Sequence, residues 1–348
     1  MLKICSSYTK ALWTSVYFKF FTRHESHPHC GKPHIPKQIL VEFQVALVQF
    51  KNLQMTSQTI NGKEIAASMK REIAVQIQEI KKNFNVIPSL AVILVGNDPA
   101  SEVYVGNKEK AAHAVGMNSL QFKMAADISE DDLIAKIREL NEDKKIHGIL
   151  VQLPLPKHID ARNIIHAIDH RKDVDGFNII NVGKLSVGEI SGIDKAMVPC
   201  TPLGCVHLLK SVKGADLAGL KTLVIGSSNI VGRPLARLLM LESCTVTIAN
   251  RSTKDLKNEC LQADVIISAA GVPDLIKADM VKKGAVIIDV GINRITLADG
   301  KTKLVGDVDF ENVKDIAHAT SPVPGGVGPM TIAYLLKNTL DCCLKIIN

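Results

Sequence analysis

The sequence of 348 residues contains no hydrophobic run approaching the ~18 apolar residues that a membrane-spanning helix needs. Its eight cysteines form neither a CxxC pair nor the spacing of a disulfide framework, so we expect free thiols in a reducing compartment. Hydrophobic residues make up 46% and charged residues 22%, the balance of an ordinary globular protein. The length allows about two domains.

A basic surface for nucleic acid is also missing from most of the chain. The formal net charge is +7, but residues 1–54 carry seven Lys and Arg against two Glu, a local charge of +5. Residues 55–348 therefore hold only about +2, without a cluster of basic residues. Because nucleic-acid binding needs clustered positive charge, we expect neither nucleic acid nor a membrane as a partner.

Residues 1–54 differ from the rest of the chain. They hold eight of the 14 Phe, Trp and Tyr residues and show no clear helical or strand periodicity. Five potential metal ligands crowd into 11 residues, namely His24, His27, His29, Cys30 and His34. Their spacing matches no standard metal site, so we expect no metal. The segment is either a basic targeting peptide or translated upstream sequence before Met55, and its Lys-, His- and Phe-rich composition favours the second.

The remainder of the chain alternates between predicted helices and strands. Apolar residues at helical spacing predict a helix over 62–83, and the unbroken apolar run 89–95 predicts a strand covered on both faces. This first series continues with helices near 99–115, 129–141 and 160–168 and strands near 119–124 and 147–151. A second series has helices near 201–213, up to 241 and 328–346, and strands near 221–225, 245–249, 264–269 and 285–290. Such alternation is typical of an α/β fold.

The second series contains a strand at 221–225, then a glycine-bearing turn and a helix. Gly226 and Gly232 lie in this turn, which offers backbone N–H groups and a helix N-terminus to a phosphate. The middle glycine of the GxGxxG pattern is missing, so a purely structural turn remains an alternative. The next strand ends in Asn250-Arg251, where an acidic residue would favour NAD and a basic one favours the 2′-phosphate of NADP. The residues therefore favour NADP.

Two polar features of the first series indicate a ligand pocket. Tyr104 and Lys108 lie one helical turn apart, so an aromatic ring and an amine share one face. The alternative is a solvated helix face. Gln152 follows the strand near 147–151, at the carboxyl end where open α/β sheets bind ligands. A strand-end amide bonded only to a loop is the alternative there.

Two further strings have the chemistry of a binding site for a flat ligand. In the string Asp173-Val-Asp175-Gly, a carboxylate can accept a planar pair of N–H donors, although an Asp-Gly turn explains the same residues. Residues 321–330 contain three prolines and three glycines, which predict a stiff loop with bare backbone. Such a loop can approach a flat ligand closely.

Four of these strings occur in one order and together resemble the bifunctional methylenetetrahydrofolate dehydrogenase/methenyltetrahydrofolate cyclohydrolase family over about residues 57–346. They are Tyr104-Val-x-x-Lys108 and the stretches 148–156, 172–176 and 322–331. The resemblance implies two α/β domains around a cleft, the second a Rossmann-type dinucleotide-binding domain, and a homodimer. It implies a folate-binding catalytic domain of residues 55–198 plus 320–348, an NADP-binding domain of 199–319, and an extension, 1–54, outside the match.

The resemblance also implies an activity and the residues that carry it. A member of this family oxidises 5,10-methylenetetrahydrofolate with NADP and hydrolyses the methenyl product to 10-formyltetrahydrofolate, without a metal. Tyr104 would stack on the folate, and Lys108 would be the key group of the hydrolysis. Gln152 would hold Lys108, and Asp175 would anchor the pterin. Further implied contacts are Val151, Leu153, Pro324, Gly325, Gly326, Gly328 and Pro329 for the substrate, and Gly226, Ser227, Ser228, Arg251 and Ile292 for the cofactor.

One departure from the family pattern bears on the cofactor. Family members commonly carry Gly-Arg-Ser after the strand, where this chain has Gly226-Ser227-Ser228. Arg251 is then expected to bind the 2′-phosphate alone, and NAD remains the less favoured alternative. The strand at 245 follows its helix without the insertion of the NAD-linked mitochondrial branch, which favours a bacterial-type, cytoplasmic NADP enzyme. A mitochondrial location is the alternative if residues 1–54 are a targeting peptide.

Two rival functions are less consistent with the sequence. Short-chain dehydrogenases also use Tyr-x-x-x-Lys, but their glycine loop precedes that pair, whereas here Gly226 follows Tyr104 and Lys108. A catalytically silent nucleotide-binding relative would be free to lose its polar site residues. The joint presence of Lys108, Gln152 and Asp175 therefore favours an enzyme.

Overall fold

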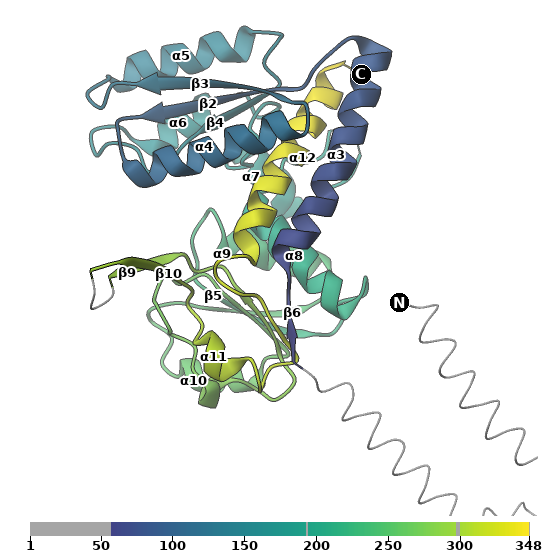
Figure 1. Cartoon of the computed structure of the whole chain (residues 1–348), viewed down its shortest axis with the longest axis vertical. Coiled ribbons are helices and arrows are strands. Elements are labelled where there is room, and N and C mark those ends of the chain that lie inside the picture. The colour runs from purple at the N-terminus through teal and green to yellow at the C-terminus, as the bar shows by residue number, and fades with distance from the viewer. Residues whose placement is uncertain (1–56, 193, 297–299, 348) are drawn as a thin grey trace, which may run out of the picture. The chain divides into compact units, whose positions relative to one another are not determined.

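A computed structural model describes residues 57–192, 194–296 and 300–347 of the chain (Figure 1). The predictions for residues 1–54, including the histidine cluster and the two explanations of the segment, lie outside these described residues. Within them, two parallel sheets and their covering helices make up the fold, in agreement with the predicted α/β class.

The first sheet has three parallel strands in the order β3-β2-β4, with bounds β2 Ser89–Val95, β3 Asn118–Met124 and β4 Gly148–Val151. All seven residues of β2 are buried, because helices cover both faces of the sheet. Leu90, Val92 and Leu94 face one core, and Ala91, Ile93 and Val95 face the other. The covering helices are α4 (Pro99–Ala114), α5 (Glu130–Glu142) and α6 (Ala161–Ala167).

The second sheet is six-stranded and entirely parallel, in the order β1-β11-β8-β7-β5-β6. Its central strands are β5 (Lys221–Ile225), β6 (Thr245–Ala249), β7 (Val265–Ser268) and β8 (Val286–Asp289). Helices α8 (Cys200–Lys213) and α9 (Gly232–Leu241) cover one face, while α10 (Leu256–Gln262) and α11 (Phe310–Val313) pack on the other. Since all strands are parallel, their carboxyl ends lie along one edge, where such sheets bind nucleotides.

Two short strands at the edge of the second sheet depart from the predicted domain limits. β1 (Gln58–Thr59) pairs with β11 (Ala319–Thr320), which in turn pairs with β8. The predicted limits place residues 58, 59 and 320 in the folate-binding domain, whereas these residues hydrogen-bond to the sheet of the other domain. A strand of two residues has no period that a sequence pattern can reveal, so only the tertiary pairing identifies it.

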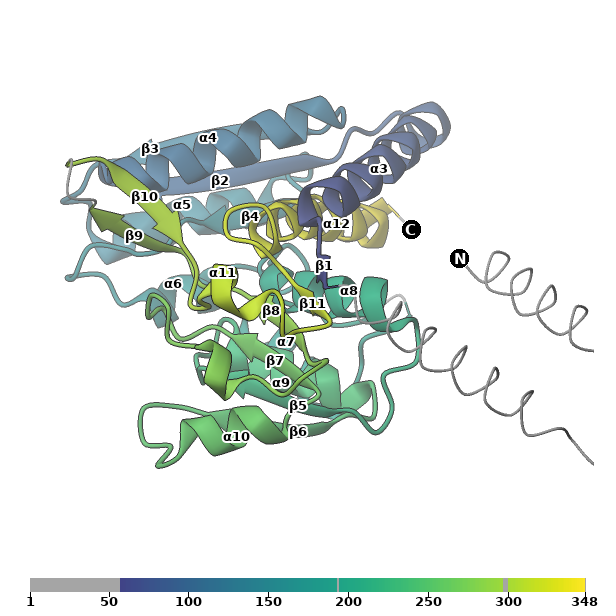
Figure 2. The same ribbon diagram turned by 60° about the horizontal axis from the view of Figure 1, so that its bottom comes forward.

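Helices α3 (Gly62–Phe84) and α12 (Val327–Ile347) pack side by side and connect the two sheets (Figures 1 and 2). α12 also packs against α8 and against β2 and β4 of the first sheet. The buried Asn338 on α12 donates from Nδ2 to the carbonyls of Val174, at 2.8 Å, and Val198, at 2.9 Å. These hydrogen bonds tie α12 to the segment that carries Asp175 and to the segment that leads into α8.

Several short elements were not predicted. They are α7 (Ile179–Val187), α10, α11, the 3-10 helix η1 (Ala278–Met280) and the hairpin of β9 (Asn293–Thr296) and β10 (Thr302–Val305). α7 exposes Ile179, Val182 and Val187, so its apolar residues mark no single buried face. The six cysteines among the described residues are free and buried. No helix in the described ranges is long and apolar enough to cross a membrane.

Candidate functional site

The predicted amine and amide of the first domain meet in space. Lys108 on α4 donates from Nζ to Oε1 of Gln152, at 2.9 Å, although 44 residues separate them in the chain. Gln152 is itself fixed, because its backbone N–H donates to Ile93 O and its Nε2 donates to Leu153 O, at 2.9 and 2.6 Å. The amide therefore presents its oxygen to the amine. Val151, the last residue of β4, is buried.

Tyr104 lies one turn before Lys108 on α4, and 41% of its surface is exposed. An aromatic ring this open has a face available to a flat ligand. Partial burial raises the pKa of its hydroxyl, and the positive charge of Arg294 partly opposes that rise. Arg294 belongs to β9, so the hairpin of the second domain brings a cation near the aromatic residue of the first.

Asp173 and Asp175 have different surroundings, and these separate the turn-forming carboxylate from the one available to a ligand. Asp173 is buried and forms the turn: it accepts from Gly176 N, Asn178 N and Asn181 Nδ2, at 3.0, 2.8 and 2.9 Å. Asp175 makes no such hydrogen bond in the described part of the chain, and its side chain remains available to a ligand. Burial raises the pKa of Asp175 to about 6; the charge of Lys108 opposes this rise, and that of Asp173 adds to it.

The Pro/Gly-rich loop that precedes α12 packs its backbone against the start of α3. Gly326 N donates to Pro322 O, at 2.8 Å, and Lys63 N donates to Gly325 O, at 3.1 Å. A Cβ at Gly62 would lie 1.9 Å from Gly326 O, so the two backbones touch. Pro324 in this loop is exposed. Gly328 and Pro329 were predicted to lie in the loop, but they lie in the first turn of α12, where they are partly exposed.

The glycine turn after β5 is tight and its backbone is bare. Gly226 has a φ of +113°, and a Cβ there would lie 2.3 Å from Ala269 O. A Cβ at Gly232 would lie 1.9 Å from Gly226 O. The Ser228 hydroxyl accepts from Val231 N and Gly232 N, at 3.2 and 3.4 Å, and so caps the start of α9. Ser227 beside it is partly exposed.

Arg251 and Ile292 lie at the carboxyl ends of β6 and β8. The Asn250 side chain accepts from Ser252 N, at 2.9 Å, which makes a turn that projects Arg251 outward. The exposed Arg251 has no hydrogen-bond or ion-pair partner among the described residues. Ile292 is 49% exposed, unusual for an isoleucine, and it lies between Gly291 and Asn293, which are both held by hydrogen bonds.

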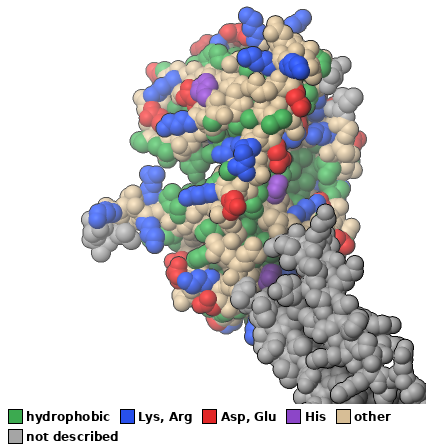
Figure 3. Space-filling view, turned by 45° about the vertical axis from the view of Figure 1, so that its right-hand side comes forward, with side chains coloured by type: hydrophobic (Ala, Val, Ile, Leu, Met, Phe, Trp, Pro, Cys, Tyr) green, Lys and Arg blue, Asp and Glu red, His purple; other side chains and the backbone are tan. Residues whose placement is uncertain are grey.

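Cations are dispersed rather than gathered on the face shown in Figure 3, where Lys and Arg are mixed with Asp and Glu.

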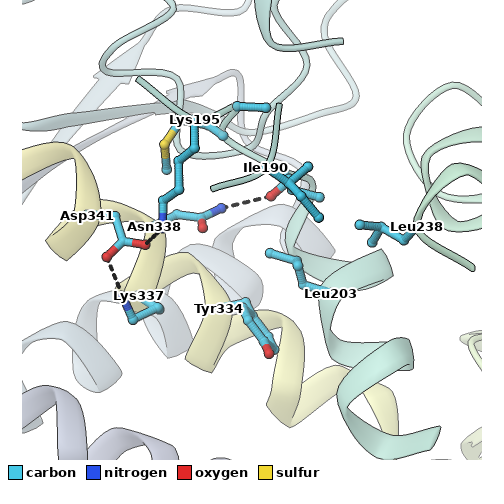
Figure 4. A pocket seen from close by; sticks show the side chains of 11 residues that line it. Ile190, Lys195, Leu203, Leu238, Tyr334, Lys337, Asn338 and Asp341 are labelled. Atoms are coloured by element: carbon cyan, nitrogen blue, oxygen red, sulfur yellow. Dashed lines mark hydrogen bonds and ion pairs between the residues drawn. The ribbon is translucent and has the colours of Figure 1, made fainter. Parts of the chain in front are cut away.

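A separate cavity of about 220 Å³ lies between α8, α9 and α12, and none of the predicted site residues lines it (Figure 4). In it, Asp341 accepts hydrogen bonds from Lys195 Nζ, at 2.9 Å, and from Lys337 Nζ. These ion pairs connect α12 to the segment before α8.

Three side chains near the site were missed by the sequence reasoning. Arg233 lies just after Gly232 and bonds to Asn229 Oδ1, at 2.8 Å, so a second cation accompanies the glycine turn. Arg294 lies on an unpredicted hairpin, close enough for its charge to act on the Tyr104 hydroxyl. Asp307 anchors the loops around Ile292. The arginine after Gly232 was visible in the sequence, but the other two depend on pairing between distant segments.

These observations define a class of protein: a two-domain α/β protein with a Rossmann-type sheet for a dinucleotide and an amine-bearing ligand site on the other sheet. Residues 60–175 match the tetrahydrofolate dehydrogenase/cyclohydrolase catalytic domain, and residues 199–346 match the NAD(P)-binding domain of the same name. The chain belongs to the tetrahydrofolate dehydrogenase/cyclohydrolase family.

Individual relatives agree with this assignment. The chain is 53% identical over 291 residues to the bifunctional protein FolD of Cereibacter sphaeroides, which covers 84% of this chain and 96% of that protein. The crystal structure of the bifunctional FolD enzyme of Campylobacter jejuni superimposes with a TM-score of 0.78 at 46% identity, covering 82% and 98% of the two chains. The Trypanosoma brucei enzyme, complexed with NADP and an inhibitor, gives a TM-score of 0.77 at 34% identity, covering 83% and 97%.

Proposed function

We propose that this chain is a bifunctional folate enzyme that oxidises 5,10-methylenetetrahydrofolate to 5,10-methenyltetrahydrofolate with NADP and hydrolyses the product to 10-formyltetrahydrofolate. The contact that carries the proposal is the hydrogen bond of 2.9 Å between Lys108 Nζ and Gln152 Oε1, one helical turn from the open ring of Tyr104. A purely structural hydrogen bond does not need an exposed aromatic beside it. The family assignment supports both reactions.

The residues of the second domain fit a dinucleotide. The N–H groups of Ser227 and Ser228 in the turn have no hydrogen-bond partner among the described residues, so phosphate oxygens can bind there. Those of Gly226, Val231 and Gly232 are already bonded within the protein. Arg251 offers an unpaired guanidinium at the place where the 2′-phosphate is expected. We assign cofactor binding to Gly226, Ser227, Ser228, Arg251 and Ile292. When bound, NADP supplies the acceptor for the hydride.

The first domain positions the folate. We propose that Asp175 accepts N–H donors from the amino-pyrimidinone edge of the pterin, while the Tyr104 ring stacks on the ligand. The hydride leaves the bridging methylene carbon, which becomes the methenyl cation. Water then attacks this carbon and Lys108 takes up one of the two water protons. Lys108 returns this proton to N5 as the bond from the carbon to N5 breaks, and the hydroxyl proton leaves to solvent, which gives the 10-formyl product. Gln152 holds the amine in place throughout.

The remaining substrate contacts are proposed on the same basis. They are backbone or apolar groups around the amine and the Pro/Gly-rich loop, namely Val151, Leu153, Pro324, Gly325, Gly326, Gly328 and Pro329. We assign folate binding to residues 55–198 plus 320–348 and NADP binding to residues 199–319. The β1 and β11 pairing adds residues 58, 59 and 320 to the sheet of the second domain.

Replacing the amine should separate the two activities. In Lys108→Met we expect hydrolysis of methenyltetrahydrofolate to fall by about 10²–10⁴-fold, because proton transfer is lost, while part of the dehydrogenase activity remains. The absorbance of the methenyl compound follows both reactions. Lys110→Met, an exposed lysine on the same helix, is the control and should leave both rates unchanged. Intact hydrolysis in Lys108→Met contradicts the role of Lys108.

The raised pKa of Asp175, about 6, predicts a pH dependence. As the pH falls through this value the carboxylate takes up a proton and loses an acceptor site. The dehydrogenase kcat/KM for the folate should therefore fall below about pH 6, by roughly tenfold per unit. Asp175→Asn should give a low and flat profile between pH 5 and 7.5. A flat profile in the unmodified protein excludes Asp175 as the titrating anchor.

Removing the unpaired guanidinium tests the cofactor preference. Arg251→Ala should weaken NADP binding by ~1–3 kcal/mol, the cost of a lost charge-assisted contact, and should change NAD binding little. Titration calorimetry with both dinucleotides measures this difference. Lys254→Ala, an exposed cation three residues later, is the matched control. Equal losses for NADP and NAD leave Arg251 without a part in the preference.

We also propose that the protein is a homodimer that works in the cytoplasm. Within the described residues, β6 is the outer strand of its sheet and Ile248 on it is 43% exposed, so an edge is available for pairing. A sedimentation mass equal to one chain contradicts the dimer. The bacterial origin of the relatives supports the cytoplasmic location. Imaging of the chain with and without residues 1–54 tests it, and signal confined to mitochondria favours the targeting alternative.

A further inference from the structure

Asp307 is a fully buried carboxylate that accepts five hydrogen bonds from two separate loops. Oδ2 accepts from Ser268 Oγ, Ala270 N and Gly271 N, at 3.0, 2.7 and 3.1 Å. Oδ1 accepts from Val272 N, at 3.1 Å, and from Asn293 Nδ2, at 2.9 Å. Ser268 ends β7, the three backbone donors follow it, and Asn293 opens β9. A single side chain therefore fixes the loop after β7 to the loop after β8.

A second buried carboxylate, Asp289, completes the arrangement. Its Oδ1 accepts from Gly291 N and Asp307 N, at 2.9 and 3.0 Å, and its Oδ2 accepts from Val308 N, at 3.0 Å. There is no room for other side chains: a Cβ at Gly291 would lie 2.2 Å from Asp307 Oδ1. The Asp289 N–H donates to Ser321 Oγ, at 2.8 Å, so the cluster also contacts the start of the Pro/Gly-rich loop.

These contacts connect the two ends of the proposed cofactor site. The Ala269 carbonyl packs against Gly226 of the glycine turn. The next N–H groups along the chain, from Ala270 onward, donate to Asp307. On the other side, Asn293 is held by Asp307 and Gly291 by Asp289, so Ile292 between them is fixed at both neighbours. The carboxylate of Asp307 therefore connects the glycine turn at Gly226 to the segment around Ile292.

We propose that Asp307 is a positioning residue for hydride transfer: its carboxylate sets the loops after β7 and β8 so that the nicotinamide half of the cofactor lies at a fixed place beside the folate. This inference rests on the proposed function. A carboxylate is required because all five partners are donors, and an amide in its place turns an NH₂ group toward some of them. The hydrolysis of the methenyl compound needs no nicotinamide, so that reaction does not depend on Asp307.

The experiment compares Asp307→Asn with the unmodified protein, using the full chain in both cases. We expect the dehydrogenase kcat/KM for NADP to fall by about 10- to 100-fold, the equivalent of one or two buried N–H groups left without an acceptor. Hydrolysis of methenyltetrahydrofolate, assayed without cofactor, should stay within about twofold. The affinity for 2′,5′-ADP, which has the adenosine half alone, should also be retained. Asp315→Asn, an exposed carboxylate nearby, is the matched control.

The outcomes separate the inference from the function on which it rests. If the unmodified chain has neither activity, the proposed function fails. If the unmodified chain has both, then an undiminished dehydrogenase in Asp307→Asn, or equal loss of both activities, overturns the positioning role. Should Asp307→Asn fail to fold, Asn293→Ala removes one donor of 2.9 Å from the partly buried rim of the cluster. That variant should show the same selective loss to a smaller degree, and its absence overturns the inference.

Discussion

The hydrogen bond between Lys108 and Gln152 is the contact on which the site depends. A lysine on a helix normally extends into water, where its position is not defined. Here the Gln152 amide at the end of β4 holds the amine at 2.9 Å. Its Nε2 donates to Leu153 O, and the backbone N–H of Gln152 donates to Ile93 O of the neighbouring strand. The amine is thereby fixed relative to a buried parallel sheet, beside the ring of Tyr104. The proton transfers proposed for the second reaction require this degree of positioning.

Buried carboxylates organise both halves of the molecule. The oxygens of Asp173 accept hydrogen bonds from the turn that presents Asp175. Those of Asp289 and Asp307 accept hydrogen bonds from the loops around Ile292. In each case N–H donors compensate for the loss of water. The loops at the carboxyl ends of the strands thus keep defined shapes although they contain little regular structure. Loops of defined shape can hold one ligand in the same place during both proposed reactions.

The long elements and the main site strings followed from the sequence. The strand prediction for residues 89–95 has the observed bounds of β2, because a run of apolar residues covered on both faces leaves an unambiguous pattern. The helix expected near 328–346 is observed as Val327–Ile347. The spacing of Tyr104 and Lys108 placed them on one helical face, but it did not bring Gln152 to the amine. That meeting depends on how α4 packs against β2 and β3 of the sheet to which β4 also belongs.

The sequence by itself determined the α/β class, the order of the main elements, the family, and the residue types available to a folate and a dinucleotide. These depend on local periodicity and on short strings, each of which is contiguous in the chain. Only the tertiary structure decided that β1 and β11 join the second sheet, that Arg294 approaches Tyr104, and that Asp307 connects two loops. The physical reason is that two-residue strands and single buried side chains carry no periodic signal. Their partners lie tens to hundreds of residues away and are selected by packing and hydrogen bonding alone.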